Sequence, residues 1–212
     1  GYLANGRRGL GNVGFRRVVT LDIDFAHNGF WEDFVLTFEN AAVLHSTHKH
    51  HEDSPRLRLI MPIDREVSPD EYVAISRKIA GDLDIELFDN TTFEPNRLMF
   101  WPSTPKDIDY YFKTQDGPWV NADEILESYI DWKDSSLWPT ADKQIDRIRD
   151  AAEKQQDPTA KKGVIGAFCR TYTLTEAIEA YLTDEYSPVD GDSSRWTYKK
   201  GSTAAGLIIY DD

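Results

Sequence analysis

The sequence contains a single cysteine, no long apolar run and no phosphate-binding loop of the form GxxxxGKS or GxxxxGKT. The lone Cys169 excludes an internal disulfide and a cysteine metal cluster, which suits a reducing cytoplasm. No apolar stretch approaches the roughly 20 residues that cross a bilayer, and no signal-peptide pattern is present. We therefore expect a cytoplasmic protein without a membrane partner.

The chain also lacks the surplus of basic charge that is typical of nucleic-acid binding. It carries 37 acidic and 24 basic residues, and its formal net charge is −13. The excess is unevenly distributed, because residues 1–60 hold seven residues of each sign, whereas residues 61–212 hold 17 basic and 30 acidic ones. All five histidines lie in residues 1–60 as well. The chemistry is therefore expected in this neutral part.

The 212 residues, of which 40% are hydrophobic, suffice for one large domain or for a core with a small appendage. The chain starts with Gly1 rather than Met, and residues 211–212 directly follow a strand-like apolar run. These ends predict a fragment of a longer protein.

Hydrophobic periodicity and turn residues predict an α+β fold in which a mostly antiparallel sheet is flanked by helices. Ser68, Pro69 and Glu71 have the spacing of a helix start with a capping box. We assign a core to residues 1–115, with strands at 17–25, 42–46 and 56–63, helices at 30–41 and 68–81, and strand-like pieces at 85–89, 97–101 and 110–114.

Residues 116–212 are predicted to form a helical accessory region that ends in a β-hairpin and packs back on the core. Asn121 and Glu124 indicate the start of its first helix. The expected elements are helices at 121–132, 141–156, 162–172 and 173–183, a polar loop at 184–194, and a hairpin of 195–199 with 204–210.

Two acids stand two residues apart in the first strand, at Asp22 and Asp24. Side chains alternate across a β-strand, so both carboxylates point to one face while Leu21 and Ile23 point to the other. Two acids this close repel each other unless a cation lies between them, and oxygen ligands favour Mg²⁺ or Mn²⁺. The pattern therefore indicates a divalent-metal site, although an acidic edge-strand face is the commoner meaning of an isolated pair.

Two further pairs fit the binding of phosphate. Ser46 and His48 end the next strand on one face, where a hydroxyl and an imidazole can donate to phosphate oxygens. Arg56 and Arg58 share one face of the following strand, and paired guanidiniums suit bidentate phosphate recognition. Each pair alone is also compatible with a solvated strand end or strand face.

A third carboxylate would complete the metal site. We favour Asp89, because the apolar residues Leu87 and Phe88 deliver it from a buried strand, and Arg97 follows after a short loop to hold a triphosphate tail. Other acids remain open alternatives: Asp84, Glu86, Asp107 and Asp109. Asp107 and Asp109 are the strongest rivals, since they repeat the spacing of the first pair.

The order of these pieces resembles the archaeo-eukaryotic primase superfamily, in which an acid-x-acid strand is followed by Ser-x-His and by an apolar strand ending in Asp. Longer runs resemble the N-terminal primase-polymerase domain of virulence-associated protein E-type replication proteins of phages and mobile elements. The resemblance extends over most of the chain, and its runs are TLDIDFA at 20–26, STHKHHEDSPRLRLIMPI at 46–63, FDNTTFEPNRLMFWPST at 88–104, DGPW at 116–119 and RWTYKKGSTAAGLIIYDD at 195–212.

The resemblance implies template-directed nucleotidyl transfer by a DNA primase or DNA polymerase that uses two Mg²⁺ or Mn²⁺ ions. Asp22, Asp24 and Asp89 would be the catalytic metal ligands. Nucleoside or deoxynucleoside triphosphate would be held by Ser46, His48, Arg56, Arg58 and Arg97. The implied partners are a single-stranded DNA template, with Arg7, Arg8, Arg16 and Arg17 as backbone contacts, and a helicase-like ATPase region outside these residues.

Three other interpretations remain open. Four histidines, at positions 45, 48, 50 and 51, could form a zinc site. His48-Lys49-His50 could be a degenerate motif of a rolling-circle nickase with Tyr72 as its nucleophile, although Lys49 replaces the apolar residue that this motif needs. The domain could also be a catalytically silent nucleic-acid-binding adaptor of a replisome.

Overall fold

A computed structural model describes residues 1–144 and 157–210 of the chain. The chain divides into two compact units. The first comprises Gly1–Trp132 and Trp138–Asp142, and the second comprises Lys133–Leu137 and the described part of Lys143–Asp212. The candidate residues discussed above all lie in the first unit.

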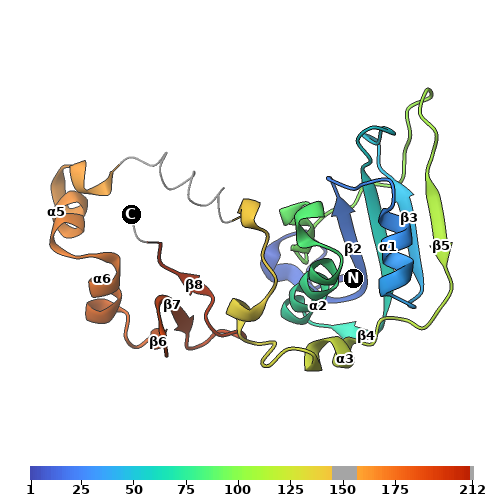
Figure 1. Ribbon diagram of the computed structural model, residues 1–212. Coiled ribbons are helices and arrows are strands. Elements are labelled where there is room, and N and C mark those ends of the chain that lie inside the picture. Colours follow the sequence, from blue (N-terminus) through green and yellow to red (C-terminus); the bar gives the residue numbers. More distant parts are fainter. Residues whose placement is uncertain (145–156, 211–212) are drawn as a thin grey trace. The chain divides into compact units, whose positions relative to one another are not determined.

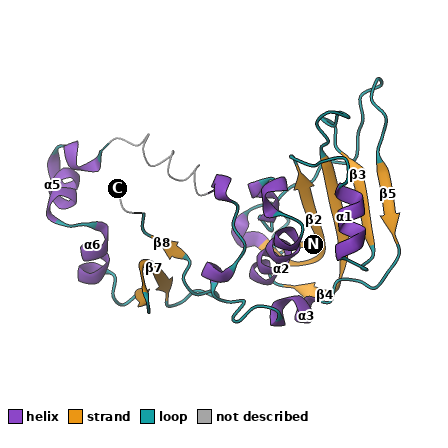
Figure 2. Ribbon diagram, in the orientation of Figure 1, coloured by secondary structure: helices purple, strands orange, loops and turns teal. Residues whose placement is uncertain are grey.

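The first unit is built on a five-stranded sheet with the order β1-β2-β4-β3-β5 (Figures 1 and 2). Every pair of neighbouring strands in this sheet is antiparallel, as the sequence predicts. The strands are β1 (Tyr2–Leu3), β2 (Val13–Ile23), β3 (Ala42–Ser46), β4 (Leu57–Val67) and β5 (Phe112–Gln115).

The two faces of this sheet differ in the way that the alternation of β2 predicts. Val19, Leu21 and Ile23 are fully buried, whereas Thr20 and Asp22 are half-buried on the opposite face. Leu21 is paired with Leu59 of β4, which is in turn paired with Leu44 of β3, so one face carries a continuous apolar row. Burial of such side chains contributes about 1.5–3 kcal/mol each.

Two helices pack on the apolar face of the sheet: α1 (Phe30–Thr37) and α2 (Pro69–Asp82) (Figure 1). Ser68 caps α2 by accepting a hydrogen bond from the Glu71 amide, and the Glu71 carboxylate accepts one from the Ser68 amide. The predicted capping box is therefore confirmed. The buried residues of both helices join those of β2, β3 and β4 in one core.

Several predicted elements differ from the structure in extent or type. The helix predicted over 30–41 ends at Thr37, and β5 begins at Phe112 rather than at residue 110. The strand predicted at 85–89 is a 3-10 turn at Ile85–Leu87, followed by a single bridge between Phe88 and Ile23. Residues 97–101 form no strand. Prolines at positions 95, 102 and 105 flank this segment, and proline cannot donate to a β-ladder.

The first compact unit extends beyond the boundary that the sequence suggested near residue 116. Helix α3 (Ala122–Glu127) contributes Ala122 and Leu126 to the core of this unit, and Asn121 caps it as predicted. The helix that the sequence predicted over 121–132 ends at Glu127. Tyr129 continues the contact by donating its hydroxyl to the Ala74 carbonyl of α2.

The described residues of the second unit include two short α-helices and a three-stranded antiparallel sheet of order β6-β7-β8. The predicted hairpin is present, but β6 lies where the sequence suggested only a polar loop. Most of the helix predicted over 141–156 lies outside the described residues. The elements are α5 (Gly163–Thr171), α6 (Leu174–Tyr181), β6 (Tyr186–Val189), β7 (Asp192–Tyr198) and β8 (Leu207–Ile208).

Among the described residues, we find no helix with the length and apolar character required to cross a membrane.

Candidate nucleotide and metal site

Asp22, Arg58 and His45 form a row across three neighbouring strands on the face opposite the helices. Asp22 of β2 is paired with Arg58 of β4, and Arg58 is paired with His45 of β3. The Arg58 Nε donates a hydrogen bond to Asp22 Oδ1 at 2.6 Å, and its Nη1 donates to the Phe100 carbonyl at 2.7 Å. The guanidinium is therefore held at both ends, in a site where Arg58 itself is buried.

Asp24 and Arg56 repeat this relationship two residues away, where Asp24 directly follows β2 and Arg56 directly precedes β4. The Arg56 Nη1 lies 2.9 Å from Asp24 Oδ1. Both side chains are more exposed than the Asp22–Arg58 pair, at 33% for Arg56 and 38% for Asp24. The alternation of side chains along β2 and β4, continued by the one residue that follows β2 and the one that precedes β4, thus places two acids and two arginines together, as the sequence predicts for each pair separately.

Asp89 reaches the same place from a different segment. Its amide donates to the Asp22 carbonyl at 2.9 Å, and the bridge between Phe88 and Ile23 holds the segment against β2. The Asp89 carboxylate accepts hydrogen bonds from the amide and the hydroxyl of Thr91. Arg97 Nη2 lies 3.3 Å from Asp89 Oδ2. Each of the three acids is therefore paired with its own arginine.

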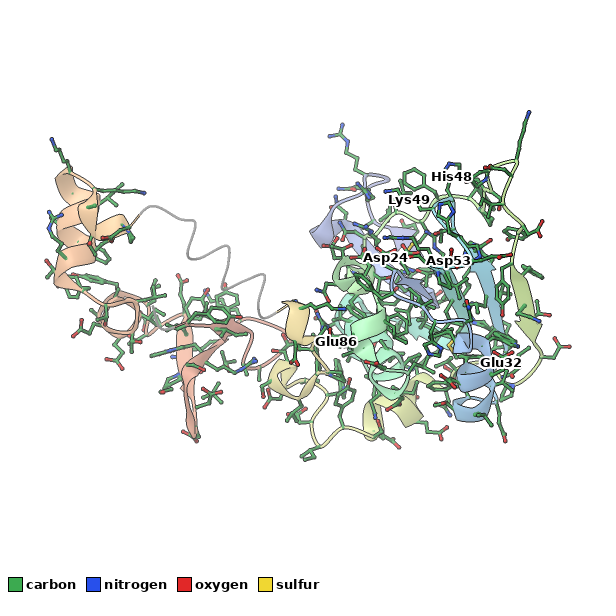
Figure 3. The ribbon with its side chains drawn as sticks, turned by 45° about the horizontal axis from the view of Figure 1, so that its top comes forward. Asp24, Glu32, His48, Lys49, Asp53 and Glu86 are labelled. Atoms are coloured by element: carbon green, nitrogen blue, oxygen red, sulfur yellow. The ribbon has the colours of Figure 1, made fainter. Side chains whose placement is uncertain are left out.

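The three acid–arginine pairs line one cleft, which we call the acid cleft, with a volume of about 280 Å³. Figure 3 shows Asp24, His48 and Lys49 at the same end of the first unit. Seven of the eight residues predicted for the site line this cleft. The full lining is Asp22, Asp24, His45, Thr47, His48, Lys49, Arg56, Arg58, Asp89, Arg97, Phe100, Trp101, Pro102 and Ser103.

Ser46 is the predicted site residue that the structure does not bring to the cleft. Its side chain is buried, and its hydroxyl accepts a hydrogen bond from the Tyr111 amide at 3.1 Å. Ser46 is paired with Leu57, on the core face of the sheet. Its neighbours His45 and Thr47 line the cleft instead, and sequence reasoning missed both. The pairing of His45 with Arg58 could have placed His45 in the cleft, but the register of β3 against β4 was not evident from the sequence.

His48 lies just beyond the end of β3 and is exposed. Its Nδ1 is 3.2 Å from the hydroxyl of Ser103, which lies on the loop that also carries Phe100 and Trp101. This contact joins two of the segments that border the cleft. Lys49 is exposed beside His48, so two groups that can bind anions stand at the rim.

The rival third acids lie elsewhere. Asp107 and Asp109 line a separate pocket together with His50, His51 and other residues. Asp84 accepts a hydrogen bond from the Glu86 amide and caps a 3-10 turn. Neither Asp84 nor Glu86 lines the acid cleft. Of the five acids considered from the sequence, Asp89 is the one that shares a cleft with Asp22 and Asp24.

The described residues contain no group of three or more His, Cys, Asp or Glu side chains placed to hold a metal ion. The four histidines at positions 45, 48, 50 and 51 therefore form no such group, and the structure gives a zinc site no support. Burial and the nearby charge of His51 lower the pKa of His50 despite the opposing effect of Glu52, and its Nδ1 accepts a hydrogen bond from the Arg56 amide. His45 Nδ1 lies 2.8 Å from the Ser46 carbonyl.

The same finding applies to Asp22, Asp24 and Asp89, whose carboxylates are engaged by arginines. Their chemistry nevertheless fits Mg²⁺ or Mn²⁺, because carboxylates are the hard oxygen donors that these ions prefer. In the structure an arginine nitrogen contacts one oxygen of each of these carboxylates. The cleft therefore holds three acid–arginine ion pairs and, among the described residues, no preformed metal cage.

Comparison with known proteins assigns the chain to a family. Residues 1–141 match the model of the VapE N-terminal domain, and the chain belongs to this family. The resemblance to the N-terminal domain of virulence-associated protein E-type proteins is therefore confirmed. No curated protein matches the chain.

A solved structure of the primase-polymerase of cyanophage S-2L, comprising its AEP domain, is similar to part of the chain. The match has 12% sequence identity and a TM-score of 0.42, and it covers 57% of this chain. It covers 64% of that chain, which is less than two thirds of its length.

Proposed function

We propose that the cleft binds a nucleoside triphosphate together with two Mg²⁺ or Mn²⁺ ions and catalyses template-directed nucleotidyl transfer, as a primase or a DNA polymerase. The observation that carries this proposal is the gathering of three carboxylates, three arginines, Lys49 and His48 in one cleft. Acids alone would suit a cation and bases alone a phosphate. Their combination suits a metal-bound triphosphate.

Asp22, Asp24 and Asp89 would hold the cations. Bound there, the ions would supply activation of a primer 3′-hydroxyl and neutralisation of charge on the α-phosphate and the leaving pyrophosphate. The side chains of this chain would bind, align and neutralise the reactants, since phosphoryl transfer depends chiefly on positioning and electrostatics.

The three arginines differ in their freedom to leave their acids. Arg58 is buried and also donates to the Phe100 carbonyl, so we assign it to positioning Asp22. Arg56 and Arg97 are 33% and 37% exposed, and each has a single carboxylate partner in the cleft. These two guanidiniums would turn from carboxylate to triphosphate when cation and nucleotide enter together, because both ionic partners are then exchanged at once.

His48 and Lys49 would hold the triphosphate tail at the rim, where both are exposed. The template is proposed to be single-stranded DNA, and both nucleoside and deoxynucleoside triphosphates fit the chemistry of the cleft. Within a longer replication protein of a phage or mobile element, the domain would act beside a helicase-like ATPase region.

Primer synthesis and extension on single-stranded DNA test this proposal. The wild-type chain should incorporate labelled nucleotide in the presence of Mg²⁺ or Mn²⁺, and Asp24→Asn should not. The matched control is Asp109→Asn, which removes an exposed acid from the separate pocket. Incorporation by Asp24→Asn at the wild-type rate would refute the proposed role of the cleft.

A catalytically silent nucleic-acid-binding adaptor is the second candidate. It is favoured by one observation, namely that the described carboxylates of the cleft are paired with arginines rather than arranged around a cation site. Retained DNA binding without any nucleotide incorporation would support it. A rolling-circle nickase gains no such support, because Tyr72 is fully buried in the core and its ring packs against the Arg16 guanidinium.

A further inference from the structure

Edge strand β5 carries an exposed aromatic ring, Phe112, on the face of the sheet that holds the acid cleft, and Tyr110 lies just before it. Phe112 is paired with His45, which is paired with Arg58, which is paired with Asp22. Directly paired residues point to the same side of a sheet, so Phe112 ends a row that begins at Asp22.

The two rings form one continuous stack with His45. Tyr110 and Phe112 have ring centroids 6.1 Å apart and planes 21° apart. The Tyr110 ring is stacked on His45 at 6.2 Å, and His45 itself lines the acid cleft. Tyr110 is 45% exposed and Phe112 is 52% exposed. A row of stacked rings therefore runs from the cleft to edge strand β5.

The loop on the cleft's border adds aromatic area. Phe100 and Trp101 line the cleft, yet they are 77% and 92% exposed. Large exposed aromatic side chains beside a polar cleft indicate a binding surface. The charges next to them favour a polyanion, because Lys49 and three arginines outnumber the three carboxylates of the cleft.

We propose that Tyr110 and Phe112 are a stacking platform for the bases of a single-stranded nucleic acid, which the row of rings leads toward the cleft. Bases stack on aromatic rings without regard to sequence, whereas basic groups follow the phosphates. A duplex presents no free base faces and does not fit this surface. The inference rests on the proposed function, since it assigns the template strand of that reaction to this platform.

Fluorescence anisotropy of a labelled oligothymidylate of about 15 nucleotides tests the platform, in the absence of divalent ions and nucleotide. Tyr110→Ala and Phe112→Ala should each weaken binding by about tenfold. Phe112→Leu should weaken it as well, because leucine keeps apolar volume but lacks a π-face. Tyr110→Phe should bind like the wild type.

Trp119→Ala is the matched control, since Trp119 is 53% exposed and follows the opposite end of β5. Its affinity should remain unchanged. Wild-type affinity in a Tyr110→Ala/Phe112→Ala double variant with an unchanged circular dichroism spectrum would overturn the platform. The platform would also be overturned if that variant converted a dimer of the chain to a monomer without loss of DNA binding, because β5 would then be an interface between two copies.

The two proposals fail in different ways. Loss of DNA binding in the double variant, with no nucleotide incorporation by the wild type, would uphold the platform and reject the polymerase. Nucleotide incorporation with an unchanged template KM in the double variant would uphold the polymerase and reject the platform.

Discussion

The Arg58 guanidinium donates to the Asp22 carboxylate at 2.6 Å, and the two side chains are only 10% and 16% exposed. The neighbouring Arg56–Asp24 pair has a similar contact, at 2.9 Å, but its side chains are 33% and 38% exposed. Two of the three acid–arginine pairs in the cleft therefore differ clearly in their exposure to solvent. This difference is the basis on which we assign Arg58 to positioning Asp22 and propose that Arg56 turns to the triphosphate.

Removing Arg58 should destabilise the fold more than removing Arg56. Arg58→Ala leaves a nearly buried Asp22 carboxylate without its partner, which should lower the free energy of unfolding by about 3 kcal/mol. Arg56→Ala affects a more exposed pair and should cost less than about 1 kcal/mol. Urea denaturation measures both. Equal losses in the two variants would contradict the assignment of Arg58 to positioning.

Asp89 should be the third catalytic acid. Asp89→Asn should reduce nucleotide incorporation about 100-fold or more, because cation-bound carboxylates stabilise transition-state charge by several kcal/mol. Asp107→Asn should retain the wild-type rate, since this acid lines another pocket. Primer-extension rates at saturating nucleotide measure both. The reverse pattern would transfer the role to Asp107.

His48 and Ser46 should have separable roles. His48→Ala should raise the KM for nucleotide by about tenfold with little change in kcat, as expected for the loss of a charge-assisted contact. Ser46→Ala should leave KM unchanged but lower stability by about 1–3 kcal/mol, because the Tyr111 amide loses its buried acceptor. Steady-state kinetics and urea unfolding of both variants test this. A raised KM for nucleotide in Ser46→Ala would instead indicate that Ser46 contacts the nucleotide.

Stability should fall in acid through His50. Its pKa lies below the ordinary value of 6.5, since burial and His51 disfavour the charged form more than Glu52 favours it. The unfolded chain therefore binds the proton more readily, so this stability is present above about pH 6.5 and is lost as the pH falls through the folded pKa. His50→Asn should show a flatter dependence of unfolding free energy on pH over that window. Parallel curves for the two proteins would refute this.

The sequence predicted the site better than it predicted the segments that carry it. The period of two along β2 sufficed for Asp22 and extends to Asp24, which directly follows the strand, because β2 has one buried and one open face. Asp89 was expected at the end of a strand and instead follows a 3-10 turn. The apolar Phe88 still anchors it, through the bridge to Ile23.

Ser46 shows why the remainder could not be predicted. A shift of one residue along a strand moves a side chain to the other face, and β3 is too short for its pattern to fix which face is open. His45 therefore takes the cleft position that was expected for Ser46. The proposed aromatic platform could not be predicted either, because Phe112 joins the row of Asp22, Arg58 and His45 only through the pairing of β3 with β5.

Manganese binding followed by electron paramagnetic resonance tests the central claim most directly, in the presence and absence of a non-hydrolysable nucleoside triphosphate. The wild-type chain should bind two Mn²⁺ ions when the nucleotide is present. It should bind them more weakly without nucleotide, because Arg56 and Arg97 then remain paired with their carboxylates. Asp22→Asn and Asp24→Asn should lose this binding, whereas Asp109→Asn should keep it. A wild-type chain that takes up no Mn²⁺ with nucleotide present would contradict the account.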